Sequence, residues 1–238
     1  MQDASTRSPR FARRVLWIAR LVAVATAASL PGWSSALADE PGRPELERWV
    51  KRLAAPELEG RLGEGARKAA GAIIDEFRRL GLEPLFDGEY VQEIPPSPPA
   101  ETVGRNVGAV LRGSDPKLSA RYVILSAHYD HLGVREGVLY PGADDNASGV
   151  AMMLESARCL AGAAERPRRS VVFLAFDQEE AGLYGSRYFV ARPPFAIEDV
   201  ELFVTADMIG RSLGGVCDDF FFVMGTEHAP GLRPWIAD

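Results

Sequence analysis

The chain has 238 residues, of which 47% are hydrophobic and 25% charged, a composition that argues against a disordered protein. Residues 1–38 hold five Arg and one Asp, so the rest of the chain has 22 basic and 32 acidic residues and a net charge of −10. No basic run remains that could follow a phosphate backbone, so nucleic acid is excluded as an expected partner.

Residues 1–38 have the three-part layout of a secretory signal peptide. The basic stretch RSPRFARR precedes the mostly apolar VLWIARLVAVATAASL, and Ala36-Leu37-Ala38 places small residues two apart. The alternative is a membrane anchor, but the apolar run after Arg20 has only about ten residues, whereas a spanning helix needs about 20. We therefore expect cleavage and export to the periplasm or the medium, with no membrane association afterwards and residues 39–44 as a linker.

The next segments predict two helices, a connection and a strand. Residues 45–53 suit a short helix, and the Gly-rich APELEGRLGEG (55–65) is typical of a loop. Apolar residues then recur on one helical face from Ala66 to Leu80, and Gly81 ends that helix. Four prolines in VQEIPPSPPAE (91–101) indicate a connection, and RNVGAVLRG (105–113) reads as a strand.

Three apolar runs dominate the second half of the chain. They are RYVILSA (121–127), SVVFLAF (170–176) and VELFVTA (200–206). A helical pattern follows Gly149, and a further helix is expected from about Gly182 to before Pro193. Continuous apolar runs that alternate with helices predict an α/β fold with a mostly parallel central sheet flanked by helices.

Each of these runs ends at, or leads within four residues to, a polar side chain that can bind a metal. His128 and Asp207 follow the first and third runs directly, and Glu179-Glu180 follow the second. Asp144 lies in the Gly-rich loop after His128. Sites in α/β sheets form at the carboxyl ends of the strands, so these residues should converge. His, Asp and Glu without Cys suit zinc or a related divalent ion.

The acidic residues in this set have two interpretations each. Two adjacent glutamates are costly to bury in ionised form without a compensating charge, so one could bind metal while the other handles protons. The alternative is a solvated acidic turn before a helix. Asp130 could orient His128 by accepting its second ring N–H, or it could lie in a surface turn.

The remaining histidines and the two cysteines are less informative. His131 could be a further ligand, although we favour a supporting or exposed position, and His228 reads as a surface histidine in a loop. A bridge between Cys159 and Cys217 is possible in an exported protein. A small buried residue in a helix is the favoured interpretation of Cys159.

Five segments, in order, resemble the M28 metallopeptidases, zinc aminopeptidases of the bacterial leucyl aminopeptidase type. They are NVGAVLRG, SAHYDHLG, PGADDNASGVAMMLE, FLAFDQEEAGLYGS and ADMIGR, and LEGRLGEG is similar to the N-terminal region of that family. The resemblance covers roughly residues 45–238. It implies a three-layer fold of the zinc-exopeptidase, phosphorylase/hydrolase-like kind and a site for two zinc ions.

The resemblance also implies a role for each site residue. Glu179 would be the general base, and Asp130 would orient His128. The metal ligands would be His128 and Asp207 on one zinc, Glu180 on the other, and Asp144 bridging both, with a cis peptide between Asp144 and Asp145.

One expected ligand has no match in the printed sequence. The family's second zinc takes a further histidine well downstream of the Asp207 position, and His228 is too close to Asp207 to match it. The resemblance thus implies a peptidase domain that lacks its C-terminal part, and it leaves the activity of this chain open. The expected function is an aminopeptidase acting on peptides with a free N-terminus. The alternatives are a glutaminyl cyclase on the same fold and a non-catalytic binding domain.

Overall fold

The computed structural model describes residues 42–98, 102–211 and 223–225. The expected signal peptide, His228 and Cys217 lie outside these residues. Among the described helices, none combines the length and the apolar character that a membrane span requires.

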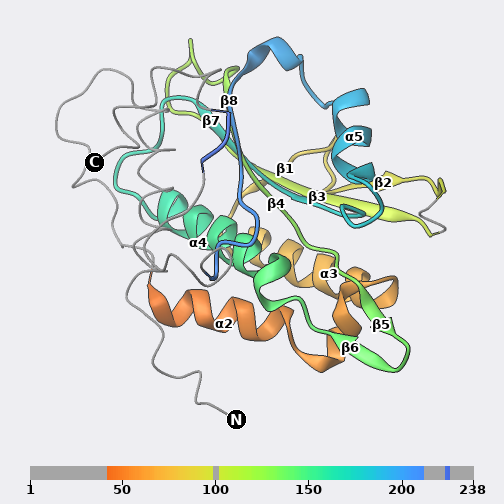
Figure 1. Cartoon of the computed structure of the whole chain (residues 1–238). Coiled ribbons are helices and arrows are strands. Elements are labelled where there is room, and N and C mark those ends of the chain that lie inside the picture. Colours follow the sequence, from red (N-terminus) through yellow and green to blue (C-terminus); the bar gives the residue numbers. More distant parts are fainter. Residues whose placement is uncertain (1–41, 99–101, 212–222, 226–238) are drawn as a thin grey trace.

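A mixed six-stranded sheet forms the centre of the molecule (Figure 1). Its strands are β1 (Glu83–Pro84), β2 (Val91–Ile94), β3 (Gly104–Leu111), β4 (Tyr122–His128), β7 (Ser170–Phe176) and β8 (Val200–Thr205). The order is β1-β3-β7-β4-β8, with β2 also paired to β3. Strand β4 runs parallel to β7 and β8, whereas β3 runs antiparallel to β7. The α/β class is confirmed, but the described sheet is parallel only in the half that carries the site.

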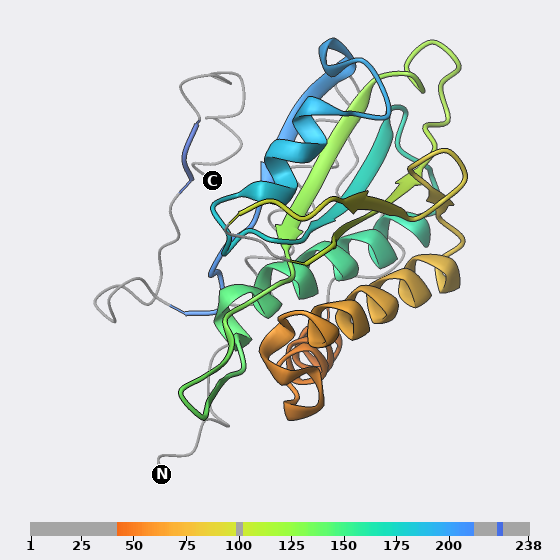
Figure 2. The ribbon, with the colours of Figure 1, turned by 90° about the vertical axis from the view of Figure 1, so that its right-hand side faces the viewer.

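Helices cover both faces of this sheet (Figures 1 and 2). Helices α2 (Arg43–Leu53), α3 (Glu64–Arg79) and α4 (Gly149–Ala161) pack on one face and enclose the larger core. Helix α5 (Tyr184–Ala191) packs on the other face, where its Phe189 joins a smaller core. The helices predicted around residues 45–53, 66–80, 150–161 and 182–192 are all present.

Burial on both faces explains the continuous apolar run of β7. Val171 and Phe173 point into the larger core, while Val172 and Leu174 point into the smaller one. Because both sets are removed from water, the strand has no polar face, and its sequence shows no alternation.

Several short elements were not predicted. The first four residues of the proline-rich segment form β2, so the expectation of a plain connection is wrong there. The loop expected at 55–65 contains the 3-10 helix η3 (Pro56–Arg61). A hairpin of β5 (Gly133–Arg135) and β6 (Val138–Tyr140) precedes the π-helical turn η4 (Ala143–Ser148). Elements this short carry too few residues for a periodic signal.

Candidate metal centre

The site residues lie at the carboxyl ends of the three parallel strands, as the apolar runs predicted. His128 is the last residue of β4, and Asp207 lies two residues beyond β8. Glu179 and Glu180 lie in the turn between β7 and α5. The turn η4, between β6 and α4, brings aspartates to the same edge of the sheet.

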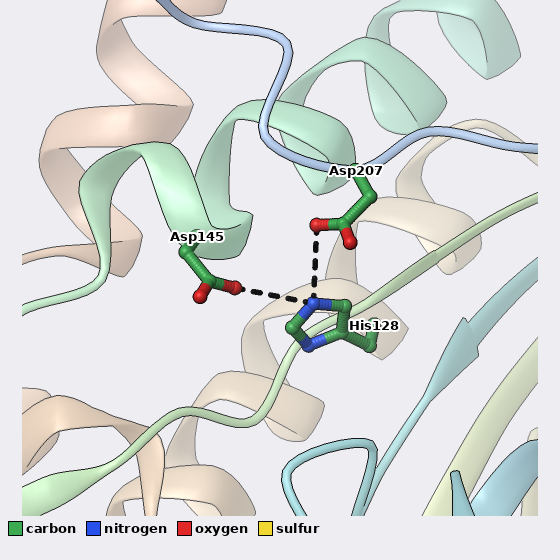
Figure 3. Close-up of side chains that lie close together, drawn as sticks. All are labelled: His128, Asp145 and Asp207. Atoms are coloured by element: carbon green, nitrogen blue, oxygen red, sulfur yellow. Dashed lines mark ion pairs between the residues drawn. The ribbon is translucent and has the colours of Figure 1, made fainter. Parts of the chain in front are cut away.

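One nitrogen of His128 faces three carboxylates, and Figure 3 shows two of them, those of Asp145 and Asp207. Its Nε2 lies 3.3 Å from Asp145 Oδ1, 3.4 Å from Asp207 Oδ1 and 3.9 Å from Glu179 Oε2. The imidazole is buried, and its Nδ1 lies 3.5 Å from Asp130 Oδ1. Several negative charges therefore converge on a single buried nitrogen.

This surrounding charge favours a cation at the site. Burial alone would lower the pKa of His128, but the nearby carboxylates of Asp130, Asp207 and Glu179 outweigh it and raise the pKa to about 10. A divalent metal ion would supply positive charge at the same place and would bind the ring nitrogen instead of that proton. The donor set of this cluster thus fits a metal.

A second group of ligand atoms adjoins the first. His131 Nδ1 lies 2.7 Å from Glu180 Oε1 and 3.8 Å from Asp145 Oδ2. In each group, one imidazole and two carboxylates bring their ligand atoms within 4.8 Å of one another. Asp145 belongs to both groups, with one oxygen toward each histidine. Imidazole and carboxylate are ligands that zinc accepts in catalytic sites.

The structure corrects the predicted position of the shared carboxylate by one residue. Asp145, not Asp144, lies between the two histidines. Asp144 instead accepts the N–H of Gly210 at 2.7 Å and pairs with Arg211 Nε at 3.0 Å. The cis peptide expected between Asp144 and Asp145 lies between Asp145 and Asn146. Adjacent side chains leave the backbone in different directions, so only the path of the loop decides which aspartate reaches the histidines.

Asp130 connects the turn that carries Glu179 and Glu180 to the imidazole of His128. Its Oδ1 accepts the backbone N–H of Glu179 at 3.0 Å and its Oδ2 that of Glu180 at 3.2 Å. The same carboxylate faces Nδ1 of His128. Asp130 thus fixes the turn that carries both glutamates in relation to the imidazole.

Glu179 belongs to neither ligand group but adjoins the first. About a third of its side chain is exposed, and it faces His128. Burial raises the pKa of Glu179; His128 opposes the shift, while the negative charges of Asp130, Glu180 and Asp207 add to it. A carboxylate with a raised pKa beside a metal position is suited to accepting a proton.

Arg61 is a site residue that the sequence pattern did not predict. Its guanidinium is fully buried, and its pKa falls to about 10 because of that burial, with the charges of Asp130, Asp145 and Glu180 in opposition. It donates to five backbone carbonyls, those of Leu53, Tyr129, Pro141, Gly142 and Asp145. Three of these belong to the loop that carries Asp145. The only sequence signal was an arginine within a Gly-rich segment.

We expect Arg61→Met to lower the free energy of unfolding of the metal-free protein by about 3 kcal/mol or more, because five carbonyls would lose their donor, and those of Leu53, Tyr129 and Gly142 belong to buried residues. Urea unfolding with a chelator present measures this. The free energy of unfolding of Arg61→Lys should lie between those of the wild type and Arg61→Met, since an ammonium group has three donors instead of five. Arg67→Met is the control, because Arg67 is exposed and, within the part of the chain that the structure describes, pairs only with Glu64 of the same helix. A loss below 1 kcal/mol for Arg61→Met would contradict this role.

Comparison with known proteins places the chain in a family. The model of peptidase family M28 matches residues 106–237, more than half of the chain. The chain belongs to peptidase family M28. A probable zinc metalloprotease of Leptosphaeria maculans is 36% identical to this M28 chain over 159 residues, 63% of the chain and 36% of that protein. The chain spans between 22% and 36% of the length of four curated relatives that it matches.

Solved structures share the fold of this M28 chain. A Zn-dependent exopeptidase from Parabacteroides distasonis superposes with a TM-score of 0.60 at 22% identity, covering 74% of this chain and 64% of that one. A glutaminyl cyclase from Bacteroides thetaiotaomicron gives 0.55 at 18% identity, covering 69% and 61%. The zinc-exopeptidase fold expected from the sequence is confirmed. Several members of this family that resemble the chain are named probable zinc metalloproteases.

Proposed function

We propose that the chain carries the catalytic centre of an exported zinc aminopeptidase, which hydrolyses the N-terminal bond of peptides that have a free α-amine. The observation that carries this proposal is the Asp145 carboxylate between two imidazoles, with the carboxylate of Glu179 beside them and outside both ligand groups. Export rests on the signal-peptide layout of residues 1–38 alone.

The residues divide into those that hold metal and those that handle protons. His128, Asp145 and Asp207 would hold one ion, and Glu180 with Asp145 would hold a second. Zinc in such a site polarises a carbonyl oxygen and increases the acidity of water. Glu179 takes a proton from the attacking water and passes it to the amine that leaves as the C–N bond breaks. Asp130 keeps Glu179 at the required place through its bond to the Glu179 N–H.

The charge of the site supports cleavage at the N-terminus. Four carboxylates, from Asp145, Glu179, Glu180 and Asp207, surround the two histidines. The nearby guanidinium of Arg211 is paired with Asp144. Two divalent ions would offset these four charges overall, but the carboxylate of Glu179 belongs to neither ligand group and would bind a protonated α-amine in preference to the neutral amide of an internal residue.

The test is a comparison of substrates on the purified, zinc-loaded chain. We expect release of the N-terminal amino acid from short peptides, no release from the same peptides with an N-acetyl cap, and loss of the activity when a chelator removes the metal. Zinc should restore it. Peptides with N-terminal glutamine serve as the control for the alternative function: their cyclisation with loss of ammonia would indicate a glutaminyl cyclase. Zinc binding without turnover of any substrate would overturn the enzymatic proposal.

A further inference from the structure

We propose that Asp177 is a positioning residue, which holds the turn that carries Glu179 against the first residues of strand β3. This inference rests on the proposed function, because Glu179 is the carboxylate that would accept the proton. Asp177 is buried and directly follows strand β7. Asp130 binds the backbone N–H groups of Glu179 and Glu180, and Asp177 acts one step earlier, where the chain leaves the sheet.

Two backbone N–H groups converge on the carboxylate of Asp177. Its Oδ2 accepts the N–H of Arg105 at 2.8 Å, and its Oδ1 accepts that of Gln178 at 2.9 Å. Burial raises the pKa of Asp177 to about 6, and the charge of Asp130 adds to the shift, so the group is ionised in mildly alkaline buffer. An ionised aspartate has two acceptor oxygens and no donor, whereas asparagine has only one acceptor oxygen. The carboxylate therefore satisfies both N–H groups and joins the turn to β3.

Asn106 makes a second connection between the turn and β3. The pair of the β3–β7 ladder nearest to the turn is Val107 with Ala175. Beyond it, Asn106 Oδ1 accepts the N–H of Asp177 at 3.2 Å, so side chains continue the connection where the ladder ends. The Nδ2 of the fully buried Asn106 also donates to the carbonyl of Gly185 at 2.9 Å. Asn106 thus joins the end of β7 to the start of α5, and the turn lies between these two points.

The backbone of this turn has a conformation that needs such support. Gln178 has a φ of +56°, in the left-handed region that residues with a side chain rarely adopt. Its N–H is held by Asp177, and its carbonyl accepts the N–H of Tyr184 at 3.0 Å. Gly185 lies so close that a Cβ added to it would overlap the carbonyl oxygen of Asp177. Because the φ of Gln178 sets the direction of the chain into Glu179, loss of the Asp177 bonds would displace the Glu179 carboxylate.

A control for this role must lose buried hydrogen bonds of the same strand without a change in the turn. Ser170 begins β7, and its buried hydroxyl accepts the N–H of Gly113 at 3.1 Å and donates to the carbonyl of Ser119 at 2.6 Å. Ser170→Ala removes both bonds at the end of β7 opposite to Asp177. A purely structural role of Asp177 predicts that its substitution and Ser170→Ala have the same effects.

The experiment compares the full chain with Asp177→Asn, Asn106→Ala and Ser170→Ala in mildly alkaline buffer. Asp177→Asn keeps the size of the side chain and removes one acceptor. Asn106→Ala removes the bond to the Asp177 N–H and leaves the carboxylate in place. Urea unfolding shows whether each variant is folded. Hydrogen exchange followed by mass spectrometry measures the protection of residues 177–185, and kcat and KM are measured with a peptide that has a free N-terminus.

In Asp177→Asn and Asn106→Ala, we expect hydrogen exchange in residues 177–185 to become at least about tenfold faster, with no such change in Ser170→Ala. The kcat of both turn variants should fall about 10- to 100-fold, because a carboxylate displaced by about 1 Å transfers a proton poorly. Their KM and zinc per chain should stay within about threefold of the wild-type values. Ser170→Ala should keep the wild-type kcat.

Wild-type exchange in this segment, or a wild-type kcat, in Asp177→Asn would overturn the proposal. Equal changes in Asp177→Asn and Ser170→Ala would also overturn it, because the role of Asp177 would then be one of general stability. A wild-type chain that cleaves no peptide would contradict the proposed function alone, and the exchange rates would still decide whether Asp177 holds the turn.

Discussion

Asp145→Asn is expected to weaken zinc binding at both positions by more than about 100-fold, whereas Asp144→Asn should leave it within about threefold. The Asp145 carboxylate directs one oxygen to each histidine group, so a single substitution affects both. An amide has only one oxygen and no charge to offer in its place. The measurement is competition for zinc against a chromogenic chelator.

The two adjacent aspartates form a matched pair for this test. Asp144 contacts the N–H of Gly210 and the side chain of Arg211, so its substitution should lower stability by no more than about 1 kcal/mol. Equal loss of metal in the two variants would contradict the assignment of Asp145. Loss of zinc in Asp144→Asn alone would make Asp144 the shared metal ligand, as the family resemblance implies.

Glu179→Gln should lower kcat for a free-N-terminal peptide by about 10²- to 10⁴-fold while zinc per chain stays at the wild-type value. Glutamine has nearly the same shape but cannot accept a proton. Glu179 lies outside both ligand groups, so its loss should not remove metal. Initial rates and elemental analysis on the same preparation measure both quantities.

Glu198→Gln is the control for this substitution, because Glu198 is exposed on the short 3-10 turn η5 (Ile197–Asp199). It should keep wild-type kcat and metal content. A Glu179→Gln protein with more than a tenth of wild-type activity would remove Glu179 from proton transfer. One that loses zinc would make Glu179 a ligand instead.

The parallel half of the sheet could be predicted because its strands are buried on both faces. Such strands read as continuous apolar runs, and the polar residue that ends each run then marks the edge where a site forms. On this ground the sequence predicted that four polar residues lie close together, and the structure places them at one edge of the sheet: His128, Glu179, Glu180 and Asp207. Strand β2 and the β5–β6 hairpin are too short to produce such a pattern.

The remaining site features depend on the path of the backbone, which residue types alone do not specify. Either aspartate of GADDN satisfies the sequence pattern, and the turn η4 decides which one faces the histidines. The role of Arg61 depends on carbonyls up to 84 positions away in the chain. His131 was assigned to a supporting place because nothing in the sequence shows that its ring meets Glu180.

The buried guanidinium of Arg61 has a practical consequence for dissecting this protein. The family match begins at residue 106, so a fragment cut at that boundary would contain His128, His131, Asp145, Glu179, Glu180 and Asp207 but not Arg61. It would also lose helices α2 and α3, which cover the larger core. Such a fragment keeps every side chain proposed to touch metal. It lacks the arginine whose hydrogen bonds hold the loop that carries Asp145. Recombinant versions of the catalytic unit should therefore start upstream of α2, even though the family signature starts about 60 residues later.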